Sequence, residues 1–557
     1  MRSSKIRLSV VVGLFVLCLL AALPLGLALA RPRADTTVGG PILSDTVWTA
    51  ANSPYIVTSN INVLSGVTLT VQAGTIVKFN AGFKLQVNGQ LIVNGTSEAP
   101  VVFTSNQATP APGDWDKIEF ATTAVTSTVG PDGEYIAGSL LRGCVVEYGG
   151  ALDNSVVLVG QLMDNCTVRY SSNTGVSAIN YYDSGDTYSP SEPAWIVQST
   201  ITNNEHGVAL SKSTLMSSTV SANSDGGVSV YGGRVVGNVI RGNTATGLGY
   251  GGGLYAHGVD LRPVYVARNQ ITGNISYKAA GGAYVGGLVT FEDNIVASNL
   301  VTGTTYSDWD VYGGGLYVDG PAIVVSNTIA NNIVFAAHGV QGFGGGIYAS
   351  PGASIRGNAI VGNQVIGYSP ASGLDCGPVS QVHNNTIYGN TPFDVGVLPG
   401  GNAVSGTLNY WGTSNQAGIL SRIYDFYDNS GLGEFKFIPY LSQPDPGVPV
   451  PPPLNLALQS QPNGALKISW DANPSFATGW GYKVYYGNSS TPPFNGMGQP
   501  AGNSPIDMGS NTNIVLSAPL PKFVTVTAYD TQGHESWYAS ALSTAISYKV
   551  FLPLVLR

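Results

Sequence analysis

A two-part phrase recurs along residues 199–390, and its repetition limits the folds open to this chain. One part reads Asn-x-Ile-x-x-Asn or a close variant, and the other is a run of glycines followed by an apolar residue and then usually Tyr. Clear copies of the first part are Asn238–Asn243, Asn269–Asn274, Asn327–Asn332, Asn358–Asn363 and Asn385–Asn390. The glycine part leads into Tyr255, Tyr284, Tyr317 and Tyr348. Repetition of this kind is typical of solenoids, in which each repeat contacts only its neighbours.

The spacing of the phrase predicts a parallel β-helix. The arm from the glycines to the next Ile or Val is nearly always 12 or 13 residues long, as from Val228 to Ile240 and from Leu316 to Ile329, whereas the return arm varies from 8 to 20. Constant and variable arms indicate fixed strands with one corner that accepts insertions. Each coil would lie about 4.8 Å above the last. Equivalent Asn side chains would then bond one another as a ladder, and the Ile two positions on would fill the core.

Composition agrees with a stacked β structure. Charged residues make up only 10% of the chain, which has 72 Gly and a net charge of −8. No basic cluster is present, so we expect no nucleic-acid partner.

Residues 1–30 are predicted to be a signal peptide. Arg2, Lys5 and Arg7 precede an apolar run that ends in the A-x-A site Ala28–Ala30. The run is long, so a retained anchor is the alternative, and an uncleaved segment would be the only membrane contact. Either way we expect a secreted or cell-surface protein.

Several stretches of the first coils carry a family resemblance. Residues 69–79, 87–96 and 100–105, with Gly113-Asp-Trp115 and the closing Leu408-Asn-Tyr-Trp-Gly412, resemble secreted bacterial proteins of the pectin-lyase-like superfamily. The resemblance implies an all-β, right-handed, single-stranded parallel β-helix over residues 42–440. The repeats are also similar to those of polymorphic outer-membrane adhesins, with Ile or Val where those carry Phe. Such folds host lyases, hydrolases, epimerases, esterases and adhesins, so the resemblance implies a fold more than an activity.

The C-terminal part follows a different pattern. Residues 441–453 are a Pro-rich linker, which we expect to hold two bodies about 30–35 Å apart. Residues 454–546 contain alternating strands, with Trp470 and Tyr482 at core-like places, and resemble a fibronectin type III β-sandwich. Residues 547–557 form an apolar tail that is too short to span a bilayer.

Two cysteines occupy the Asn slot of the repeat. Cys144 and Cys166 are 22 residues apart, so they should lie on neighbouring coils. The sequence leaves open whether they form a bridge or remain two buried thiols.

The variable arms should project from one side of the rod, and they supply the predicted carbohydrate-binding residues. An aromatic ring can cover the apolar face of a sugar while polar groups take its hydroxyls. The predicted set is Tyr250, Tyr277, Tyr306, Trp309, Tyr312, His338 and Tyr368. The alternative is that each ring only fixes its own loop. The stripe Tyr255, Tyr284, Tyr317 and Tyr348 should point outward as a stacked row. We expect the row to stabilise neighbouring strands, and binding of a linear glycan along it is the alternative.

Two function hypotheses follow. The first is a protein that binds extracellular polysaccharide or a cell-surface glycan, or mediates attachment, without a metal or other cofactor. The second is a polysaccharide lyase or glycoside hydrolase acting on an acidic glycan along the loop-lined face, with Lys278, Asp308 and Asp310 as its catalytic candidates. A lyase needs a base and a cation, often calcium, and a hydrolase needs two carboxylates about the scissile bond.

Overall fold

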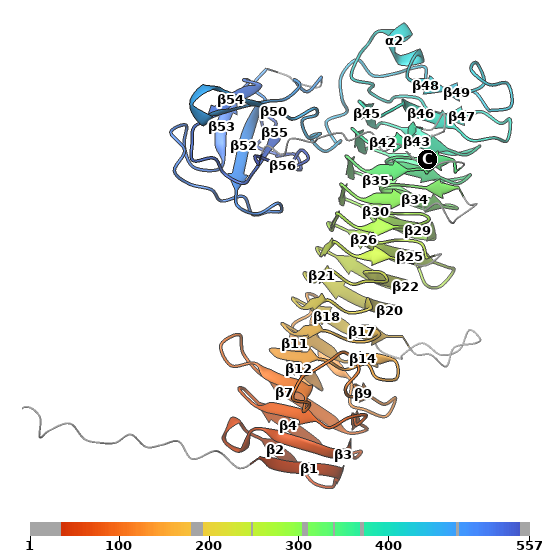
Figure 1. Cartoon of the computed structure of the whole chain (residues 1–557). Helices are drawn as coiled ribbons and strands as arrows, with labels where there is room; N and C mark the ends of the chain where they lie inside the picture. The colour runs from red at the N-terminus through yellow and green to blue at the C-terminus, as the bar shows by residue number, and fades with distance from the viewer. Residues whose placement is uncertain are drawn as a thin grey trace, which may run out of the picture.

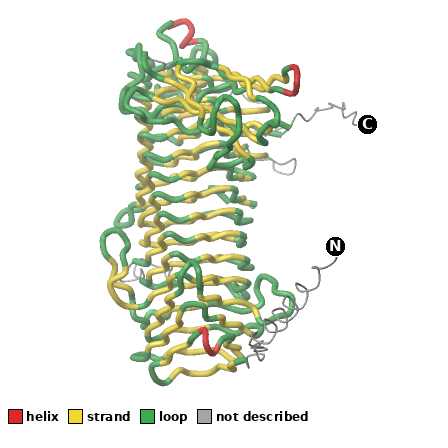
Figure 2. The backbone as a smooth tube through the Cα atoms, turned by 90° about the vertical axis from the view of Figure 1, so that its left-hand side faces the viewer, coloured by secondary structure: helices red, strands yellow, loops and turns green. Residues whose placement is uncertain are grey.

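The chain folds into a rod with a smaller body beside one end (Figure 1). The computed structural model describes residues 35–179, 193–246, 249–303, 310–337, 340–367, 372–474 and 478–545. The strands of the rod pair in parallel with their equivalents in the next coil and make one 40-stranded sheet, whose coils stack as rungs in Figure 2. The predicted parallel β-helix is therefore confirmed. The predicted signal peptide and the apolar tail 547–557 lie outside the described residues.

The sheet winds through three columns of strands. The first column carries the Asn-x-Ile phrase and consists of β1 (Thr36–Ile42), β3 (Tyr55–Val63), β5 (Ile76–Phe79), β8 (Val101–Ser105), β13 (Cys144–Glu147), β16 (Thr167–Arg169), β19 (Thr200–Thr202), β21 (Thr219–Ser221), β23 (Val239–Arg241), β27 (Gln270–Thr272), β31 (Ile295–Ala297), β36 (Thr328–Ala330), β41 (Ala359–Val361) and β45 (Thr386–Tyr388).

The second column carries the residues that follow the glycine runs. It consists of β6 (Leu85–Val87), β9 (Ile118–Phe120), β14 (Asn154–Val157), β17 (Thr174–Ala178), β20 (His206–Met216), β22 (Val228–Val236), β25 (Leu254–Gly258), β29 (Ala283–Gly287), β34 (Leu316–Asp319), β39 (Ile347–Ala349), β43 (Ser372–Cys376), β46 (Phe393–Val397) and β48 (Ile423–Tyr424).

The third column joins the second to the next Asn. It consists of β2 (Thr46–Trp48), β4 (Thr68–Gln72), β7 (Gln90–Asn94), β12 (Leu140–Arg142), β15 (Leu162–Asp164), β18 (Trp195–Val197), β26 (Val264–Ala267), β30 (Val289–Glu292), β35 (Ile323–Val325), β40 (Ser354–Arg356), β44 (Gln381–His383), β47 (Val404–Ser405) and β49 (Phe435–Lys436). The long strands β20 and β22 run through both the second and the third columns.

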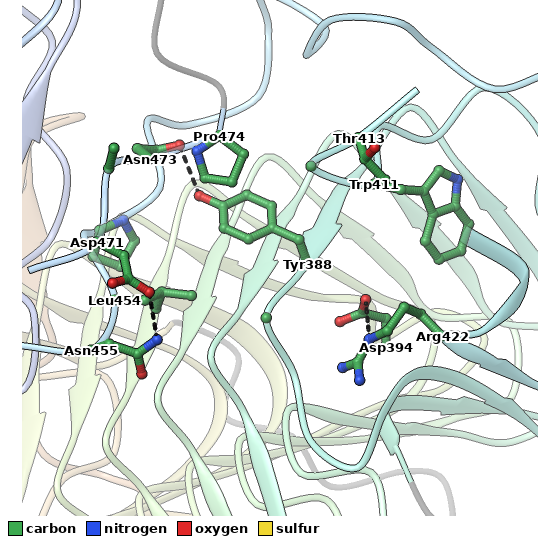
Figure 3. A pocket seen from close by; sticks show the side chains of 14 residues that line it. Tyr388, Asp394, Trp411, Thr413, Arg422, Leu454, Asn455, Asp471, Asn473 and Pro474 are labelled. Carbon is green, nitrogen blue, oxygen red and sulfur yellow. Dashed lines mark hydrogen bonds and ion pairs between the residues drawn. The ribbon is translucent and has the colours of Figure 1, made fainter. Parts of the chain in front are cut away.

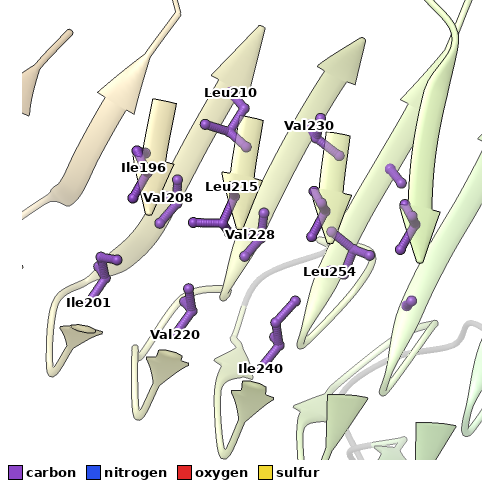
Figure 4. Packing of buried hydrophobic residues seen from close by; sticks show 14 of the residues in the cluster. Ile196, Ile201, Val208, Leu210, Leu215, Val220, Val228, Val230, Ile240 and Leu254 are labelled. Carbon is purple, nitrogen blue, oxygen red and sulfur yellow. The ribbon is translucent and has the colours of Figure 1, made fainter. Parts of the chain in front are cut away.

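The core lies between the columns and is built from one apolar position per strand. Ile201 pairs with Val220, and Val220 pairs with Ile240, so the Ile of each phrase stacks on the next. Figure 4 shows these residues facing Leu210, Leu215 and Val230 of the other columns. All are fully buried, as expected for the inward positions of a coil.

The described parts of the variable arms add strands of their own. A five-stranded parallel sheet forms from β24 (Thr244–Ala245), β28 (Ile275–Ser276), β32 (Leu300–Thr302), β37 (Ile333–Phe335) and β42 (Gln364–Ile366), and a second pair forms from β33 (Val311–Tyr312) and β38 (Gly342–Phe343). A small core of Val301, Val311, Val334 and Val340 lies beneath them. A separate antiparallel hairpin, β10 (Ser127–Val129) and β11 (Tyr135–Gly138), branches from an earlier coil.

Two antiparallel sheets around one core make up residues 454–545, called here the C-terminal body. One sheet has the order β50 (Ala457–Ser460), β51 (Leu466–Ser469), β54 (Asn513–Leu516), and the other β53 (Ile506–Gly509), β52 (Gly481–Gly487), β55 (Phe523–Tyr529), β56 (Leu542–Ser543). Trp470 and Tyr482 are buried in its core with ring centroids 5.5 Å apart. The short helices are η1 (Ala50–Asn52), α2 (Gln416–Leu420) and η2 (Pro462–Gly464).

The Pro-rich segment does not hold the two bodies apart. Leu454, directly after it, packs on Ala330, Val361 and Tyr388 of the rod. The Tyr388 hydroxyl donates to Asn473 Oδ1 of the C-terminal body at 2.9 Å. The expected separation of about 30–35 Å is therefore wrong, because this apolar side chain gains burial against the rod.

Candidate functional site

Two columns of buried amides fix the register of the coils. The first contains Asn238, Asn269, Asn294, Asn327, Asn358, Asn385 and Asn409, and the second contains Asn204, Asn223, Asn243, Asn274, Asn299, Asn332, Asn363 and Asn390. Asn332 shows the pattern: its Nδ2 donates to Asn363 Oδ1 at 2.9 Å and to the Val296 carbonyl, while its Oδ1 accepts from Asn299. The predicted Asn ladder is confirmed, and equivalent positions in successive coils are true neighbours.

The predicted tyrosine row is also present, but its ring faces are occupied. Tyr255 pairs with Tyr284, Tyr284 with Tyr317, and Tyr317 with Tyr348. The centroid distances are 4.7, 5.5 and 4.9 Å, and the first two rings are tilted by only 4°. Tyr284 is only 8% exposed, so the row does not simply point into solvent. The faces that a sugar would need are turned toward neighbouring rings.

The environment of this row holds its hydroxyls protonated. Burial raises the pKa of Tyr255 to about 12 and raises that of Tyr284 further, because the Tyr284 hydroxyl also donates to Asp319 Oδ2 at 2.9 Å. The row continues into Asp375, which pairs with Tyr348 in the register. Burial raises the pKa of Asp375 to about 6, although Ser372 and the backbone of Gly344 donate hydrogen bonds to it.

The described loop residues pack on this row. Tyr250 lies 5.5 Å from Tyr284, and Tyr312 lies 4.7 Å from Tyr348 between ring centroids. This is the arrangement expected if the rings fix their own loops. Tyr277 is half-buried. Tyr306, Trp309, His338 and Tyr368 lie outside the described residues, so their roles stay predictions.

The described catalytic candidates make structural contacts. Lys278 Nζ lies 5.3 Å from the centre of the Tyr250 ring. Asp310 accepts from the Gln341 backbone at 3.1 Å and from the Tyr312 hydroxyl at 3.5 Å. Asp308 lies outside the described residues. Neither Lys278 nor Asp310 lines either of the two cavities described below.

A cleft between the rod and the C-terminal body is the most distinctive cavity that the sequence did not predict. Its volume is about 460 Å³. We call it the inter-body cleft. Its rod wall is Ser221, Ala222, Arg241, Gly242, Thr272, Gly273 and Ser298, and its opposite wall includes Ser490, Thr491, Pro492, Phe494, Trp537 and Tyr538.

The rod wall of the inter-body cleft is one corner repeated in four coils. A one-residue corner requires a positive φ. The four corner residues have φ between 54° and 63°, and they are Ala222, Gly242, Gly273 and Ser298. Stacked corners form a strip of small residues about 14 Å long. Ser221, Thr272 and Ser298 are among its lining residues.

The opposite wall of the inter-body cleft is aromatic. Trp537 and Tyr538 are half-buried with centroids 5.0 Å apart, and Phe494 supports Tyr538 at 5.2 Å. Arg241 is the charged residue among the cleft's described lining, and its Nη1 donates to Thr491 Oγ1 at 3.4 Å across the gap. Aromatic area opposite hydroxyls and a guanidinium suits a ligand with apolar faces and polar edges.

A second cavity, of about 320 Å³, lies higher on the same joint (Figure 3). Its polar groups are already paired: Arg422 Nε donates to Asp394 at 3.1 Å, and Asn455 Nδ2 donates to Asp471 at 2.7 Å. Asp394 also ends the second amide column, because its Oδ1 accepts hydrogen bonds from the backbone N–H and from Nδ2 of Asn390. These contacts lie within the rod or within the C-terminal body, and they leave few groups for a ligand.

Neither a metal site nor a membrane-spanning helix is present among the described residues. Among the described residues, no three His, Cys, Asp or Glu side chains gather as a metal site. None of the helices in those ranges has the length and apolar character that crossing a membrane requires.

Comparison with known proteins supports the fold. Residues 40–164 match the family model of the pectate-lyase like β-helix domain. Protein bark beetle of Drosophila melanogaster is 37% identical over 71 residues, which are 13% of this chain and only 2% of that protein.

Two solved structures show weak overall similarity to this chain. A mutant of the periplasmic alginate epimerase AlgG is 11% identical with a TM-score of 0.34, over 72% of this chain and 84% of that one. The Dettilon tailspike protein is 14% identical with a TM-score of 0.16, over 91% and 84% of the two chains.

Proposed function

We propose that this protein is an exported, secreted or surface-associated β-helix that binds extracellular polysaccharide or a cell-surface glycan in the inter-body cleft. The observation that carries the proposal is the pairing of an aromatic wall, Trp537 and Tyr538, with a strip of small residues on the rod that Ser, Thr and Arg241 flank. Sugars offer apolar C–H faces to rings and hydroxyls to polar groups, so both walls have a role. Attachment to a surface follows if the glycan is part of one.

The cleft suits a glycan better than the tyrosine row does. The rings of Tyr255 and Tyr284 stack on each other at 4.7 Å, so their faces already have partners. Trp537 lies at the cleft and is half-buried, so part of its surface remains open to a ligand.

The alternative, a lyase or hydrolase acting on an acidic glycan, has no comparable support. Lys278 packs on Tyr250 and Asp310 accepts hydrogen bonds from its own and the next loop. Calcium belongs to this alternative alone.

Secretion and a fibronectin type III-like C-terminal domain are parts of the proposal. The three-stranded and four-stranded antiparallel sheets around one core support the domain assignment. The right-handed sense of the rod follows from the resemblance of its first coils.

The test compares Trp537→Ala with the wild-type chain in affinity electrophoresis through acidic and neutral polysaccharides. Loss of the ring should weaken retention at least about tenfold, which corresponds to a loss of about 1.4 kcal/mol of binding free energy. Tyr427→Ala is the matched control, since Tyr427 is 75% exposed and lies outside the cleft lining. Equal retention of the two variants would contradict the cleft as the site.

The same incubations separate binding from catalysis. Retention without new reducing ends or unsaturated product supports a binding protein. Product that disappears in Asp310→Ala or Lys278→Ala would replace the proposal with the enzyme hypothesis.

A further inference from the structure

Two cysteines occupy the position of the first amide column in coils that precede Asn238. Cys144 begins β13, and Cys166 directly precedes β16, where Val145 pairs with Thr167. Cys144 therefore lies opposite Cys166 on the neighbouring coil. The Cys166 backbone N–H donates to Ser199 Oγ on the next coil at 3.1 Å. In the same way, the backbone N–H of Asn238 donates to the side chain of Asn269 on its next coil.

A thiol is a poor substitute for an amide in this column. An amide accepts and donates strongly at once, whereas a thiol does both weakly. The Sγ atoms of Cys144 and Cys166 lie 2.6 Å apart, and each residue is 2% exposed. Cys166 Sγ also accepts a hydrogen bond from the Cys144 backbone N–H at 3.4 Å, and it contacts the carbonyls of Leu141 and Asp164, both at 3.4 Å. The main partner of each sulfur is the other sulfur.

The backbone already meets the requirement for a bond. Adjacent parallel strands lie about 4.8 Å apart, within the Cα separation of about 4.4–6.8 Å that disulfides span. The two residues hold the same place in successive coils, so their Cβ atoms point in the same direction. The spacing of the two strands is therefore compatible with a disulfide.

We propose that Cys144 and Cys166 form a disulfide that links two successive coils of the rod. The electron acceptor is a disulfide oxidant, either a protein dithiol in its oxidised form or oxidised glutathione. One thiolate attacks the oxidant and releases one of its sulfurs as a thiol. The second thiolate then displaces the other, so that two protein thiols lose their protons and the oxidant gains two thiols.

The bond forms while the coils assemble. The thiolate is the reactive species in exchange. In the folded rod the neighbouring Cys166 thiol and burial raise the pKa of Cys144 well above its usual range. Once formed, the bond is shielded from reductants because both residues are buried. Cys376 is buried alone in a later coil and serves as an internal control.

The test uses the full chain folded with oxidised glutathione, then unfolded in guanidinium and alkylated without reduction. Peptide mass spectrometry should find Cys376 alkylated and Cys144 joined to Cys166 in one linked peptide. Alkylation of both Cys144 and Cys166 to the extent of Cys376 would overturn the proposal.

Variants separate the bond from incidental oxidation. In Cys144→Ser, Cys166 should become alkylated, and Cys376→Ser should leave the linked peptide unchanged. Reduction in denaturant followed by refolding under reductant should lower the unfolding midpoint of the wild type and leave that of a Cys144→Ser, Cys166→Ser double variant unchanged. An equal shift in both proteins, or a Cys166 linked to Cys376 in place of Cys144, would contradict it.

Discussion

Each amide in the rod's two Asn columns satisfies buried groups on both sides of itself. Asn332 accepts from the backbone and Nδ2 of Asn299, and its Nδ2 donates to the Val296 carbonyl and to Asn363. Buried polar groups without partners are costly, so a column of this kind stabilises only when it is continuous. One residue therefore affects the coil on each side.

Asn332→Ala should lower the free energy of unfolding by about 2–4 kcal/mol, because it leaves the buried N–H groups of Asn299 and the Val296 carbonyl without partners. Guanidinium denaturation followed by circular dichroism measures the change. Asn402, which is exposed, is the control, and Asn402→Ala should cost less than about 0.5 kcal/mol. Similar midpoints for the two variants would show that the column adds little.

Asp375 should make stability depend on pH. Its folded pKa of about 6 is above the ordinary value of 3.8, so the native state binds the proton more tightly than the unfolded chain does. Its contribution is complete below about pH 4 and is lost as pH rises through about 6. Thermal midpoints from pH 4 to 7 should fall more in the wild type than in Asp375→Asn. Parallel curves would mean that Asp375 titrates normally.

Among the elements, the glycine runs mark where the second column meets the variable arm. Gly313 has φ near 65°, and the next two glycines lie against the following coil. A Cβ on Gly314 would lie 2.3 Å from the Gly345 carbonyl oxygen, and one on Gly315 would lie 2.6 Å from that of Gly346. The glycines are therefore required by stacking of backbone on backbone.

Gly314→Ala should destabilise the rod by about 1–3 kcal/mol, because the added methyl group forces adjacent coils apart. Gly249→Ala is the matched change in another arm, where the new Cβ meets only Ala245 at 4.0 Å. Scanning calorimetry should give a lower midpoint for the first variant and an unchanged or slightly higher one for the second. A tolerated Gly314→Ala would imply that the coils can separate locally.

At the scale of the whole molecule, Leu454 joins the two bodies by a specific fit. A Cβ on Gly362 would lie 2.7 Å from Leu454 Cδ2, and a Cβ on Gly389 would lie 2.5 Å from Leu454 Cδ1. Two glycines in successive coils therefore make room for this side chain. Interfaces between bodies of one chain are often weak, and this one is reinforced by the Tyr388–Asn473 hydrogen bond.

Leu454→Arg should release the C-terminal body, since it removes part of the about 1.5–3 kcal/mol that a fully buried Leu contributes and adds a charge. Small-angle X-ray scattering should show a larger radius of gyration, and polysaccharide retention should fall with it. Val515→Arg is the control, because Val515 is 48% exposed on the C-terminal body. An unchanged radius would place the main attachment elsewhere.

The parts of this structure that repeat were predictable, and the parts that do not repeat were not. The Asn columns, the Ile core and the alignment of Tyr255 with Tyr284 follow from equal spacing in successive coils. The sheet formed by the variable arms could not be predicted, because their lengths differ. The inter-body cleft depends on docking of Leu454, which brings Trp537 to corners that are about 240–320 residues earlier in the chain.

The stacked corners opposite Trp537 belong to coils below the two glycines that receive Leu454, so a whole number of coils separates the anchor from the ligand wall. Duplication or deletion of one repeat between them during evolution would move the aromatic wall by one coil and place it opposite a different set of corners. Recognition in such a lineage would change in discrete steps without a point substitution in the aromatic wall.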